Sequence, residues 1–429
     1  MRLYDTFSRS LVELPAAPGP VRMYFCGPTV YARAHIGNAR PFVVGMWLRS
    51  WLRSHGYDAQ LVHNITDIND KIYEAAPGAS AELAARATAW YLEDTADLGL
   101  GMPDHLPRAT ECVPQIVAFI EELVAADHAY ASGGDVYFRV ATFPEYGRLS
   151  GQKPDQVEQG EEPSALKEDA RDFALWKANK PETEDTWWDS PWGRGRPGWH
   201  IECSVMAEEI YGPAFEIHGG GLDLVFPHHE NEVAQSRALG HAFAELWAHN
   251  GMLRFTGEKM SKSAGNVATI RETIDEWGRE AVLVFFLTAS WRKPIDFSEE
   301  TMQQAAARLE TLRNAFTLEP AAHDESAWEA FAASLEDDFD TPAALAVLHE
   351  WASRRQLELL RRGLAVFGLE SLAERRDAPP EVVELAERRV QARAARDFEA
   401  SDRLRDELAA LGWQMRDEPG GGYTLVHDA

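Results

Sequence analysis

Two lysines in the second half of the chain have the type and spacing to bind phosphate groups. Lys259 and Lys262 lie in the sequence KMSKS, and a loop of this kind can place two ammonium groups against a polyphosphate and then release it. Far upstream, His35 and Asn38 lie in a turn rich in small residues, after a β-prone stretch and where a helix is predicted to begin. A lysine loop alone is more often merely solvated, and Asn38 alone is typical of a helix cap. Together, the two motifs favour a nucleotide site at the start of the helix.

Two cysteines, a histidine and a glutamate have the types that bind a soft-to-borderline metal ion. Cys26 ends the first predicted strand and Cys203 lies early in a later helix. His228 and Glu232 have the i, i+4 spacing that places side chains on one face of a helix. Two thiolates, an imidazole and a carboxylate form a tetrahedral set that suits zinc. A single buried cysteine usually only packs, however, and a His/Glu pair is often a solvated face, so the residues alone leave this open; Cys112 has no second ligand beside it and is interpreted as an incidental thiol.

Several stretches of the chain resemble one family of enzymes. The HIGN and KMSKS motifs, in this order, resemble those of class I aminoacyl-tRNA synthetases. The surrounding stretches resemble the cysteinyl-tRNA synthetases more narrowly: NITDINDK from Asn64, GWHIEC from Gly198, HGGGLD from His218 and PHHENE from Pro227. The likeness covers nearly the whole chain and is densest over 23–266. It implies an enzyme that activates cysteine with ATP as cysteinyl-adenylate and transfers the cysteinyl group to the 3′ end of tRNA(Cys).

The resemblance also implies one zinc ion per chain. The family's zinc ligands match Cys26, Cys203, His228 and Glu232, and the ion binds the sulfur of the substrate cysteine. Zinc with two thiolates and a carboxylate has a net negative charge, so it activates water poorly but still accepts a further thiolate. An apolar pocket separates near-isosteres by only about 10- to 200-fold. Serine's hydroxyl is a harder and weaker ligand, so coordination would exclude serine without an editing domain, for which no stretch is large enough.

The nucleotide and amino-acid sites follow from the same resemblance. His35 and Asn38 would donate to the α-phosphate; Asn38 stands where the family usually has a second histidine, and its amide keeps a donor but cannot become cationic. Lys259 and Lys262 would hold the β- and γ-phosphates, with Mg²⁺ on the leaving group. The cysteine carboxylate would attack the α-phosphorus in line, without a protein nucleophile. The other implied positions are His218, Gly219, Gly220, Gly221 and Asp223 on the adenosine side, and Thr66, Trp199 and His200 in the amino-acid pocket.

The predicted strands and helices place these residues at one edge of a parallel α/β sheet. A strand over 21–27, a helix over about 38–55 and a strand over 58–65 open the sheet, and polar residues follow both strands where such sheets bind ligands. Later elements are predicted as helices over 81–98 and 113–126, a strand over 135–140, a helix after Trp199, a strand over 214–217, a helix over 227–239, a strand near 247–255 and helices over 269–277 and 279–289.

The expected fold class is α/β: a class I synthetase Rossmann-like catalytic domain with an insertion, followed by a helical bundle and a small C-terminal domain. The last region is predicted to be helical over 381–411, with a mainly apolar stripe and a separate arginine stripe, and to end in a hairpin over 412–426. The predicted parts are the first half of the catalytic domain over 1–111, an inserted segment over 112–197, the second half with the KMSKS loop over 198–268, a stem-contact helical region over 269–319, a helical bundle over 320–377 and an anticodon-binding region over 378–429.

Composition limits how the chain can bind RNA. With 42 basic and 69 acidic residues the net charge is -27, which argues against sequence-independent binding, since phosphate affinity comes mostly from lysine and arginine. A local arginine stripe over 389–403 is the candidate tRNA contact.

The 3 cysteines form no disulfide framework, and there is neither a bilayer-spanning apolar run nor a signal sequence. A cytoplasmic protein is therefore expected, and we take it to be a monomer.

Two other functions share parts of this pattern. The related ligase of mycothiol synthesis joins cysteine to glucosaminyl-inositol through the same adenylate, but the Asn69-Asp70-Lys71 stretch and the additional carboxyl-terminal region argue against it. A zinc-binding paralogue that has lost activity and only binds RNA is disfavoured by intact His35, Lys259 and Lys262.

Overall fold

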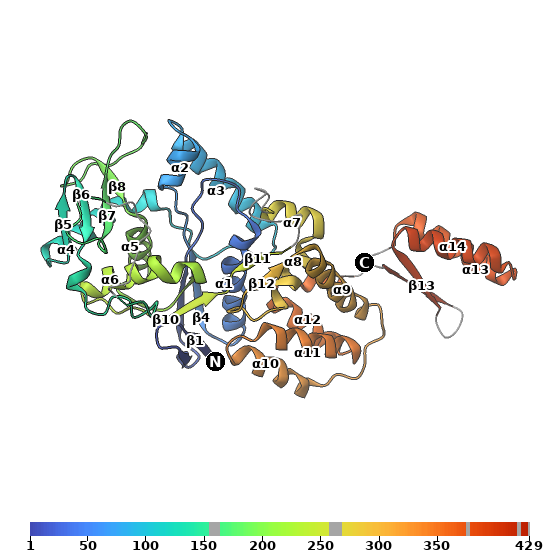
Figure 1. Ribbon diagram of the computed structural model, residues 1–429. Helices are drawn as coiled ribbons and strands as arrows, with labels where there is room; N and C mark the ends of the chain where they lie inside the picture. The colour runs from blue at the N-terminus through green and yellow to red at the C-terminus, as the bar shows by residue number, and fades with distance from the viewer. Residues whose placement is uncertain (154–163, 257–267, 375–377, 418–421, 428–429) are drawn as a thin grey trace. The chain divides into compact units, whose positions relative to one another are not determined.

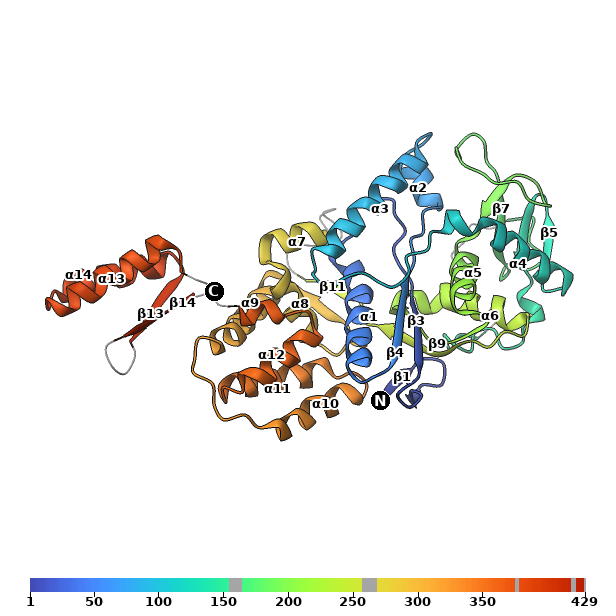
Figure 2. The ribbon, with the colours of Figure 1, turned by 180° about the vertical axis from the view of Figure 1, so that it is seen from behind.

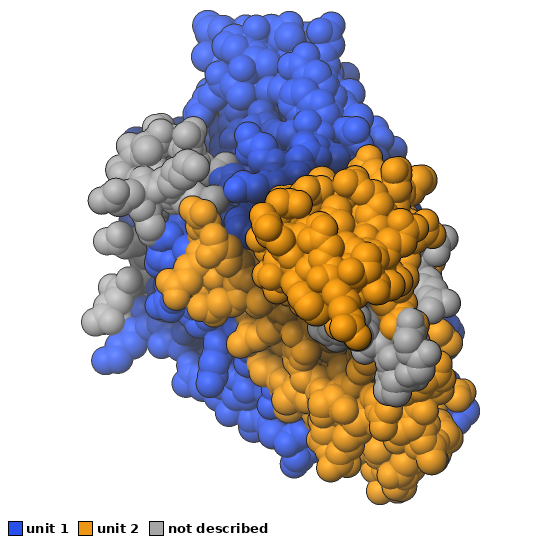
Figure 3. All heavy atoms as spheres, turned by 90° about the vertical axis from the view of Figure 1, so that its right-hand side faces the viewer, with its two compact units in different colours: residues 1–279, 289–298, 335–340 blue, residues 280–288, 299–334, 341–429 orange. Residues whose placement is uncertain are grey.

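The chain forms two compact units, shown in different colours in Figure 3. The first comprises residues 1–279, 289–298 and 335–340, and the second residues 280–288, 299–334 and 341–429. The structure, a computed structural model, describes residues 1–153, 164–256, 268–374, 378–417 and 422–427. Lys259 and Lys262 therefore lie outside the described residues, and the finer division into six parts stays a prediction.

A four-stranded parallel sheet forms the centre of the first unit. Its order is β10-β9-β3-β4, and its strands are buried along most of their length, as expected for a parallel sheet covered on both faces. In Figures 1 and 2 the sheet lies between α1 on one side and α5 and α6 on the other. The predicted parallel α/β sheet is confirmed. These elements are β3 (Pro20–Phe25), β4 (Asp58–His63), β9 (Ala214–Gly221), β10 (Phe243–Asn250), α1 (Ile36–Ser54), α5 (Trp199–Tyr211) and α6 (Glu230–Ala238).

Smaller elements border this sheet. β1 (Arg2–Asp5) and β2 (Ser10–Glu13) form an antiparallel hairpin, and β1 packs against β10. The strand predicted near 247–255 is wrong as a single element, because the chain leaves β10 at Asn250 and β11 (Leu253–Phe255) pairs in parallel with β12 (Ile295–Phe297). The break comes at Gly251, where a Cβ atom would lie 2.2 Å from the carbonyl of Lys293. The remaining elements here are α2 (Asp70–Ala75), α3 (Ser80–Ala96), the 3-10 helix η1 (Ala109–Cys112) and α7 (Ile270–Trp277).

The inserted segment folds around its own sheet. An antiparallel sheet of order β5-β6-β7-β8 packs with α4, and the hydrophobic core is continuous from Tyr24 and Val62 of the parallel sheet to Val136 and Trp176 of the insertion. Only β6 was predicted as a strand, since its partners are short or lie in proline-rich sequence. The elements are α4 (Val113–Ala125), β5 (Ala129–Ser132), β6 (Asp135–Phe138), the 3-10 helix η2 (Val140–Thr142), β7 (Phe173–Ala178) and β8 (Gly195–Pro197).

Three local differences from the predicted elements affect the site. α1 begins at Ile36, with His35 as its extended N-cap, so Pro41 lies inside the helix and leaves one carbonyl without its N–H donor. β9 runs on to Gly221, and its glycines pair with β10 as strand residues instead of forming a loop. The helix predicted over 227–239 is a π-helix, η5 (Val225–His229), followed by α6, and η5 is preceded by the 3-10 helix η4 (Leu222–Leu224).

The second unit is helical, apart from its C-terminal strands. Phe331, Trp351 and Phe367 meet in the interior of the bundle, with ring centroids 5.3 and 6.1 Å apart around Phe331. Among the described residues, no helix of either unit is both long and apolar enough to cross a bilayer. The bundle elements are α8 (Arg279–Leu287), α9 (Glu299–Ala315), η7 (Glu325–Ala327), α10 (Trp328–Glu336), α11 (Thr341–Ser353), α12 (Leu357–Val366) and η8 (Glu370–Ala373).

The C-terminal region is a helical hairpin followed by a β-hairpin. α13 (Pro380–Ala394) and α14 (Phe398–Ala410) pack side by side, and β13 (Trp413–Asp417) pairs antiparallel with β14 (Tyr423–His427), as predicted. The uninterrupted helical stripes predicted over 381–411 are wrong. Arg396 has a left-handed backbone with φ 59, and the Asp397 carboxylate caps α14 by accepting from the Ala400 amide at 3.0 Å. The arginines of the predicted stripe are therefore divided between α13, the break and α14.

Candidate functional site

Four predicted metal ligands come together at the carboxyl edge of the parallel sheet. Cys26 directly follows β3, Cys203 lies in the second turn of α5, His228 lies in η5 and Glu232 lies in α6. All four side chains are buried, and one ligand atom from each lies within 4.8 Å of all the others. The topology thus brings together residues from four separate segments, as the sequence predicts.

The separations within this cluster fit a zinc ion. Zinc binds sulfur at about 2.3 Å and imidazole nitrogen at about 2.0 Å, so a tetrahedral site has S···S and S···N edges of about 3.8 and about 3.5 Å. The Cys26 and Cys203 sulfurs lie 3.8 Å apart, and the Cys26 sulfur lies 3.6 Å from Nε2 of His228. Nε2 of His228 lies 3.1 Å from Oε1 of Glu232, an oxygen that makes no hydrogen bond within the described chain. The two separations from the Cys26 sulfur are thus close to the edges of a tetrahedral zinc site, and all other pairs of donor atoms lie within 4.8 Å.

A second set of ligand types overlaps the first. Cys26, His218, His229 and Glu232 also have one ligand atom each within 4.8 Å of one another. His218, however, donates from Nε2 to Oε2 of Glu232 at 2.8 Å, which leaves Oε1 to face His228. A carboxylate ligand held by an outer histidine is a common arrangement around protein metals, because it fixes the orientation of the ligand. The first set is therefore the better candidate, with His218 as a support.

More histidines surround the cluster than the sequence indicates. His218 was expected on the adenosine side, but it is fully buried and stacks on Trp247 with ring centroids 4.7 Å apart. His229 lies 3.3 Å from the Cys26 sulfur and 2.7 Å from His249, whose other nitrogen lies 2.8 Å from the Thr6 hydroxyl. Sequence reasoning missed His229 and His249. The paired histidines of PHHENE were the one available signal for His229.

Two of the predicted amino-acid-binding residues contact His228, one of the candidate metal ligands. Nδ1 of His200 lies 3.0 Å from Nδ1 of His228, and the Trp199 ring stacks on the His228 ring with centroids 4.5 Å apart. Trp199 is half-buried, whereas His200 is buried. Both side chains come from the first turn of α5, so this helix supplies one ligand and also fixes the orientation of another.

The third predicted residue of the amino-acid pocket, Thr66, is linked to the cluster through Asn64, and these two residues are called the floor of the cluster. Asn64 accepts from the Gly27 amide at 2.8 Å through its side-chain oxygen, which also lies 3.8 Å from the Cys203 sulfur. Its amide group donates to the Thr66 hydroxyl at 3.2 Å. A Cβ atom at Gly27 would lie 1.7 Å from the Asn64 carbonyl oxygen, so only glycine permits this close approach.

Burial shifts the pKa of each group in the cluster toward its neutral form. It raises the pKa of the Cys26 and Cys203 thiols, and it raises the pKa of Glu232 to about 8. It lowers the pKa of His228 to about 3. Desolvation is the main cause in every case, because all four side chains are removed from water. A divalent cation among them would reverse the shifts of the thiols and the carboxylate, so the cluster is chemically suited to a metal ion.

The predicted phosphate-binding histidine lies at the exposed start of α1. His35 is exposed, and the backbone N–H of Asn38 donates to the backbone carbonyl of His35 at 2.8 Å. The chain on both sides of residues 257–267 lies against this turn. The ring of Phe255 lies 6.5 Å from that of His35, and the Ile36 amide donates to the Ala268 carbonyl at 2.9 Å. Lys259 and Lys262 thus belong to a segment whose two described flanks both contact the turn of His35.

The predicted adenosine-side residues Gly220 and Asp223 differ in their surroundings. A Cβ atom at Gly220 would lie 3.1 Å from the His229 ring, so this glycine lets β9 pack closely against the histidines of the cluster. Asp223 is exposed, and its side chain folds back toward Gly221. Asp223 also lines a cavity of about 410 Å³ together with Tyr4, Thr6, Arg9, Leu149, Ser150, Gln152, Leu222, Val225 and Phe226.

Comparison with protein families finds two matches. The family described as "tRNA synthetases class I (C) catalytic domain" matches residues 13–307, and the DALR domain matches residues 330–369. The first match covers more than half of the chain and contains every residue of the cluster.

Curated relatives match along nearly the full length. The chain is 41% identical over 464 residues to a cysteine–tRNA ligase of Pseudothermotoga lettingae, covering 100% of both proteins. It is 45% identical over 447 residues to a cysteine–tRNA ligase of Alkalilimnicola ehrlichii, covering 95% of each. Among solved structures, methionyl-tRNA synthetase of Mycobacterium tuberculosis in complex with methionyl-adenylate is similar, with a TM-score of 0.61 and 15% identity over 82% of this chain and 88% of that one. This last match shows a shared fold.

Proposed function

Because the chain belongs to the cysteine–tRNA ligase family, we propose that it selects cysteine through a zinc ion held by Cys26, Cys203, His228 and Glu232. The chain is an aminoacyl-tRNA ligase of class I, and its substrates are tRNA, an amino acid and ATP. The observation that supports the zinc proposal is the convergence of four buried donor atoms within 4.8 Å of one another, with the Cys26 sulfur 3.8 Å from Cys203 and 3.6 Å from His228. One zinc per chain is proposed.

The residues of the cluster prepare a site for a thiolate. Zinc, when bound there, supplies a Lewis acid that accepts the sulfur of cysteine but holds a serine hydroxyl poorly. His218 keeps Glu232 oriented by a hydrogen bond of 2.8 Å, and Trp199 holds the His228 ring by stacking. Thr66, Trp199 and His200 would line the rest of the amino-acid pocket, since each contacts a residue of the cluster or its floor. Selection would then depend on which ligand atom the substrate offers, more than on its volume.

The phosphate end of the site would use donors around the start of α1. His35 and Asn38 would donate to the α-phosphate of ATP, where negative charge builds as the cysteine carboxylate attacks. Lys259 and Lys262 would hold the β- and γ-phosphates together with Mg²⁺ and stabilise the departing pyrophosphate. The contact of both described flanks of residues 257–267 with the turn of His35 supports this pairing.

On the adenosine side, Gly220 and Asp223 lie at and just after the carboxyl end of β9. This is where parallel sheets bind nucleotides, and an exposed carboxylate can accept hydrogen bonds from ribose hydroxyls. We further propose that the helical hairpin of α13 and α14 contacts tRNA(Cys), through arginines concentrated in an otherwise acidic chain.

We propose that the protein is a cytoplasmic monomer. A reducing compartment is consistent with the structure, since Cys26, Cys112 and Cys203 are all free thiols. Light scattering of the purified chain would test the monomeric state.

One assay tests the proposed selection. Zinc-loaded protein should catalyse pyrophosphate exchange into ATP with cysteine, and serine should support it at a small fraction of that rate. Cysteine should then be transferred to tRNA(Cys) but not to glucosaminyl-inositol. Replacing zinc by Co²⁺ should give a cysteine-dependent thiolate charge-transfer band. Equal exchange with serine, or cysteine binding without any change in the Co²⁺ spectrum, would contradict zinc-based selection.

A further inference from the structure

One buried carboxyl group beside the cluster has no partner of its own. Glu202 lies on α5 directly before Cys203, and its side chain is 0% exposed. Neither of its oxygens makes a hydrogen bond of normal geometry within the described chain. Buried carboxyl oxygens in proteins are nearly always paired, so a carboxyl group left without partners in a binding region indicates that a ligand supplies one.

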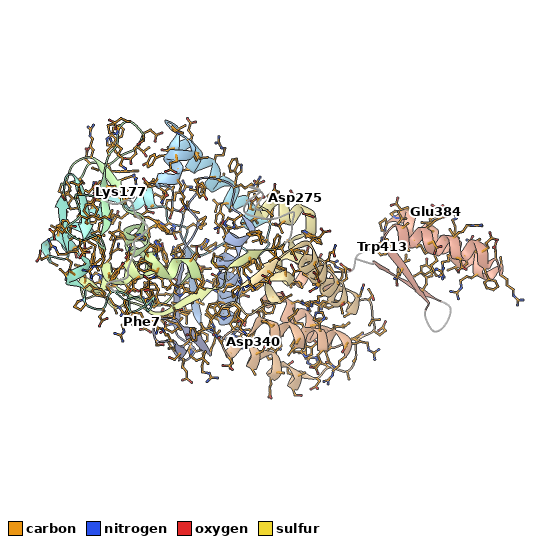
Figure 4. The ribbon with its side chains drawn as sticks, in the orientation of Figure 1. Phe7, Lys177, Asp275, Asp340, Glu384 and Trp413 are labelled. Atoms are coloured by element: carbon orange, nitrogen blue, oxygen red, sulfur yellow. The ribbon has the colours of Figure 1, made fainter. Side chains whose placement is uncertain are left out.

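The cations near Glu202 are already paired with other acids. Arg196 and Lys177, which is labelled in Figure 4, both act electrostatically on Glu202. Arg196 contacts Glu184 at 3.1 Å and also Asp70, and Lys177 contacts Asp70 at 2.9 Å. Glu202 forms no ion pair in the described chain. It is therefore the acid of this group that still lacks a cation.

The neighbouring acid shows what a satisfied carboxyl looks like here. Asp67, which also acts electrostatically on Glu202, accepts from the Thr110 amide at 3.0 Å and from the Thr110 hydroxyl at 2.7 Å. Both of its oxygens are thus occupied by the protein. The missing partner belongs to Glu202 alone.

A short line of contacts connects Glu202 with the metal ligands. Glu202 is next to Cys203 in sequence, and the Cys203 sulfur lies 3.8 Å from Asn64. Asn64 donates to the Thr66 hydroxyl at 3.2 Å, and the Thr66 hydroxyl interacts with the Glu202 carboxyl, although not as a hydrogen bond of normal geometry. Glu202 therefore lies on the Thr66 side of the cluster. In cysteine, only two carbon atoms separate the sulfur from the amino nitrogen, so a sulfur held at the cluster places the ammonium group within reach of a side chain on this flank.

We propose that Glu202 is the counter-ion for the α-ammonium group of the substrate cysteine, with the Thr66 hydroxyl beside it. This rests on the proposed function, because it takes the metal cluster as the place where the sulfur binds. The metal ion would then bind the sulfur of the substrate cysteine, and the Glu202 carboxylate would bind its ammonium group. The metal ligands are as deeply covered as Glu202, so cysteine reaches both only when the covering side chains move, and the carboxylate is then already in place.

The test compares thiols that do and do not carry an amine. Zinc-loaded full-length protein and its Glu202→Gln variant are titrated with cysteine, with cysteamine and with 3-mercaptopropionate, which has no amine. Dissociation constants come from calorimetry, and metal content from elemental analysis. Glu202→Gln should weaken cysteine and cysteamine about 10- to 100-fold, the range for a lost hydrogen bond to a charged group, and leave 3-mercaptopropionate unchanged. Metal content should not change.

A matched control lies on the same helix. Glu208 is another largely buried acid of α5, and it pairs with His241 at 2.7 Å. Glu208→Gln should leave the affinities for all three thiols unchanged. Glu202→Asp keeps the charge on a shorter side chain, so it should lower only the affinities for the two amines, and by less than Glu202→Gln.

The outcomes separate this inference from the function on which it rests. If wild-type protein binds none of the three thiols in a metal-dependent way, the proposed zinc selection fails. If wild-type protein binds them and Glu202→Gln changes none or weakens all three equally, only the role of Glu202 is overturned. Should Glu202→Gln not fold, an equal loss of all three thiols in Glu202→Asp would overturn the role in the same way, and a loss restricted to the amines would support it.

Discussion

Cys26 of the metal cluster and His35 at the start of α1 lie close together in the sequence, but their side chains are held in different ways. The Cys26 sulfur is 5% exposed and lies within 3.8 Å of Cys203, His228 and His229. His35, in the turn that follows, is exposed, and the lysines expected to act with it lie outside the described residues. One end of the site is thus enclosed by protein on every side, and the other is open to solvent.

This difference corresponds to two tasks. Selection between cysteine and serine depends on one atom, so the groups that test this atom must have fixed positions, and burial with mutual hydrogen bonds provides that. ATP binding and pyrophosphate release require groups that can approach and withdraw, which exposed side chains can do. Substitutions in the two regions should therefore change different measured quantities.

The largest effect is expected from breaking the enclosed end. Cys203→Ser replaces a thiolate by a weakly coordinating hydroxyl, so bound zinc should be lost and kcat/KM for cysteine should fall by about 10³-fold or more. ATP affinity should stay the same, because the start of α1 is untouched. Cys112→Ser is the matched control, since Cys112 belongs to neither set of ligand residues in the described chain. Retained cysteine affinity in Cys203→Ser, measured by pyrophosphate exchange and metal analysis, would contradict the assigned role.

Substitutions at the solvent-exposed phosphate end of the site should lower kcat for pyrophosphate exchange and leave the preference for cysteine over serine unchanged. Lys262→Ala removes a charge expected to stabilise the transition state, so kcat for pyrophosphate exchange should fall about 10²- to 10³-fold. Zinc content and the preference for cysteine over serine should be as in wild type. Lys153→Ala, at an exposed lysine of the insertion, should have no effect. Loss of zinc in Lys262→Ala would show that the two ends are not separate.

A pair of histidine variants sharpens the comparison with a smaller effect. His218→Phe keeps a ring stacked on Trp247 but removes the hydrogen bond to Glu232, so zinc affinity should fall about 10- to 100-fold in competition with a chelator. His35→Phe should lower kcat and leave zinc affinity unchanged. Equal zinc affinities in the two variants would mean that the outer hydrogen bond does not hold the metal ligand.

An effect of a different kind, on stability and not on binding or rate, concerns the strand beside the cluster. His63 lies between the Phe25 carbonyl at 2.9 Å and the Tyr91 hydroxyl at 2.6 Å, and burial lowers its pKa from 6.5 to about 4. Between these pH values the unfolded chain binds a proton that folded His63 does not. The contribution of His63 therefore lowers the free energy of unfolding by up to about 3 kcal/mol as the pH falls from 6.5 to 4.

His63→Gln tests this pH dependence directly. The variant should lose less stability than wild type between pH 7 and pH 4.5, as measured by urea unfolding followed through tryptophan fluorescence. An identical pH dependence in the two proteins would show that His63 does not remain neutral in the fold.

The convergence of the four candidate metal ligands could be predicted in part from topology. Residues that follow parallel strands meet at one edge of the sheet, and Cys26 has that position. The supporting histidines could not be predicted, because His218 lies in a strand whose glycines resemble a loop, and nothing near His249 marks it. The sequence HGGGLD is compatible with either a turn or a strand, and only its pairing with β10 decides between them.

The C-terminal break shows a different limit of sequence reasoning. Periodicity over 381–411 continues through Arg396 without a glycine or proline, so it favours one long helix. The chain turns there because Arg396 adopts a left-handed backbone and the small core of Val382, Ala386, Leu408 and Trp413 is buried only if the helices fold back on each other. Tertiary packing thus overrides local preference.

The hydrogen bond between Thr6 and His249 has a practical consequence for handling this protein. His249 contacts His229, and His229 contacts the Cys26 sulfur. The amino-terminal hairpin, through Thr6, therefore helps to fix the positions of residues in the metal cluster. Trimming the first six residues, which looks harmless at a terminus, would remove the hydroxyl at the end of that line and the Asp5 carboxylate that accepts from the Trp247 amide at 2.9 Å. Shortened versions of this enzyme should therefore keep residues 1–6.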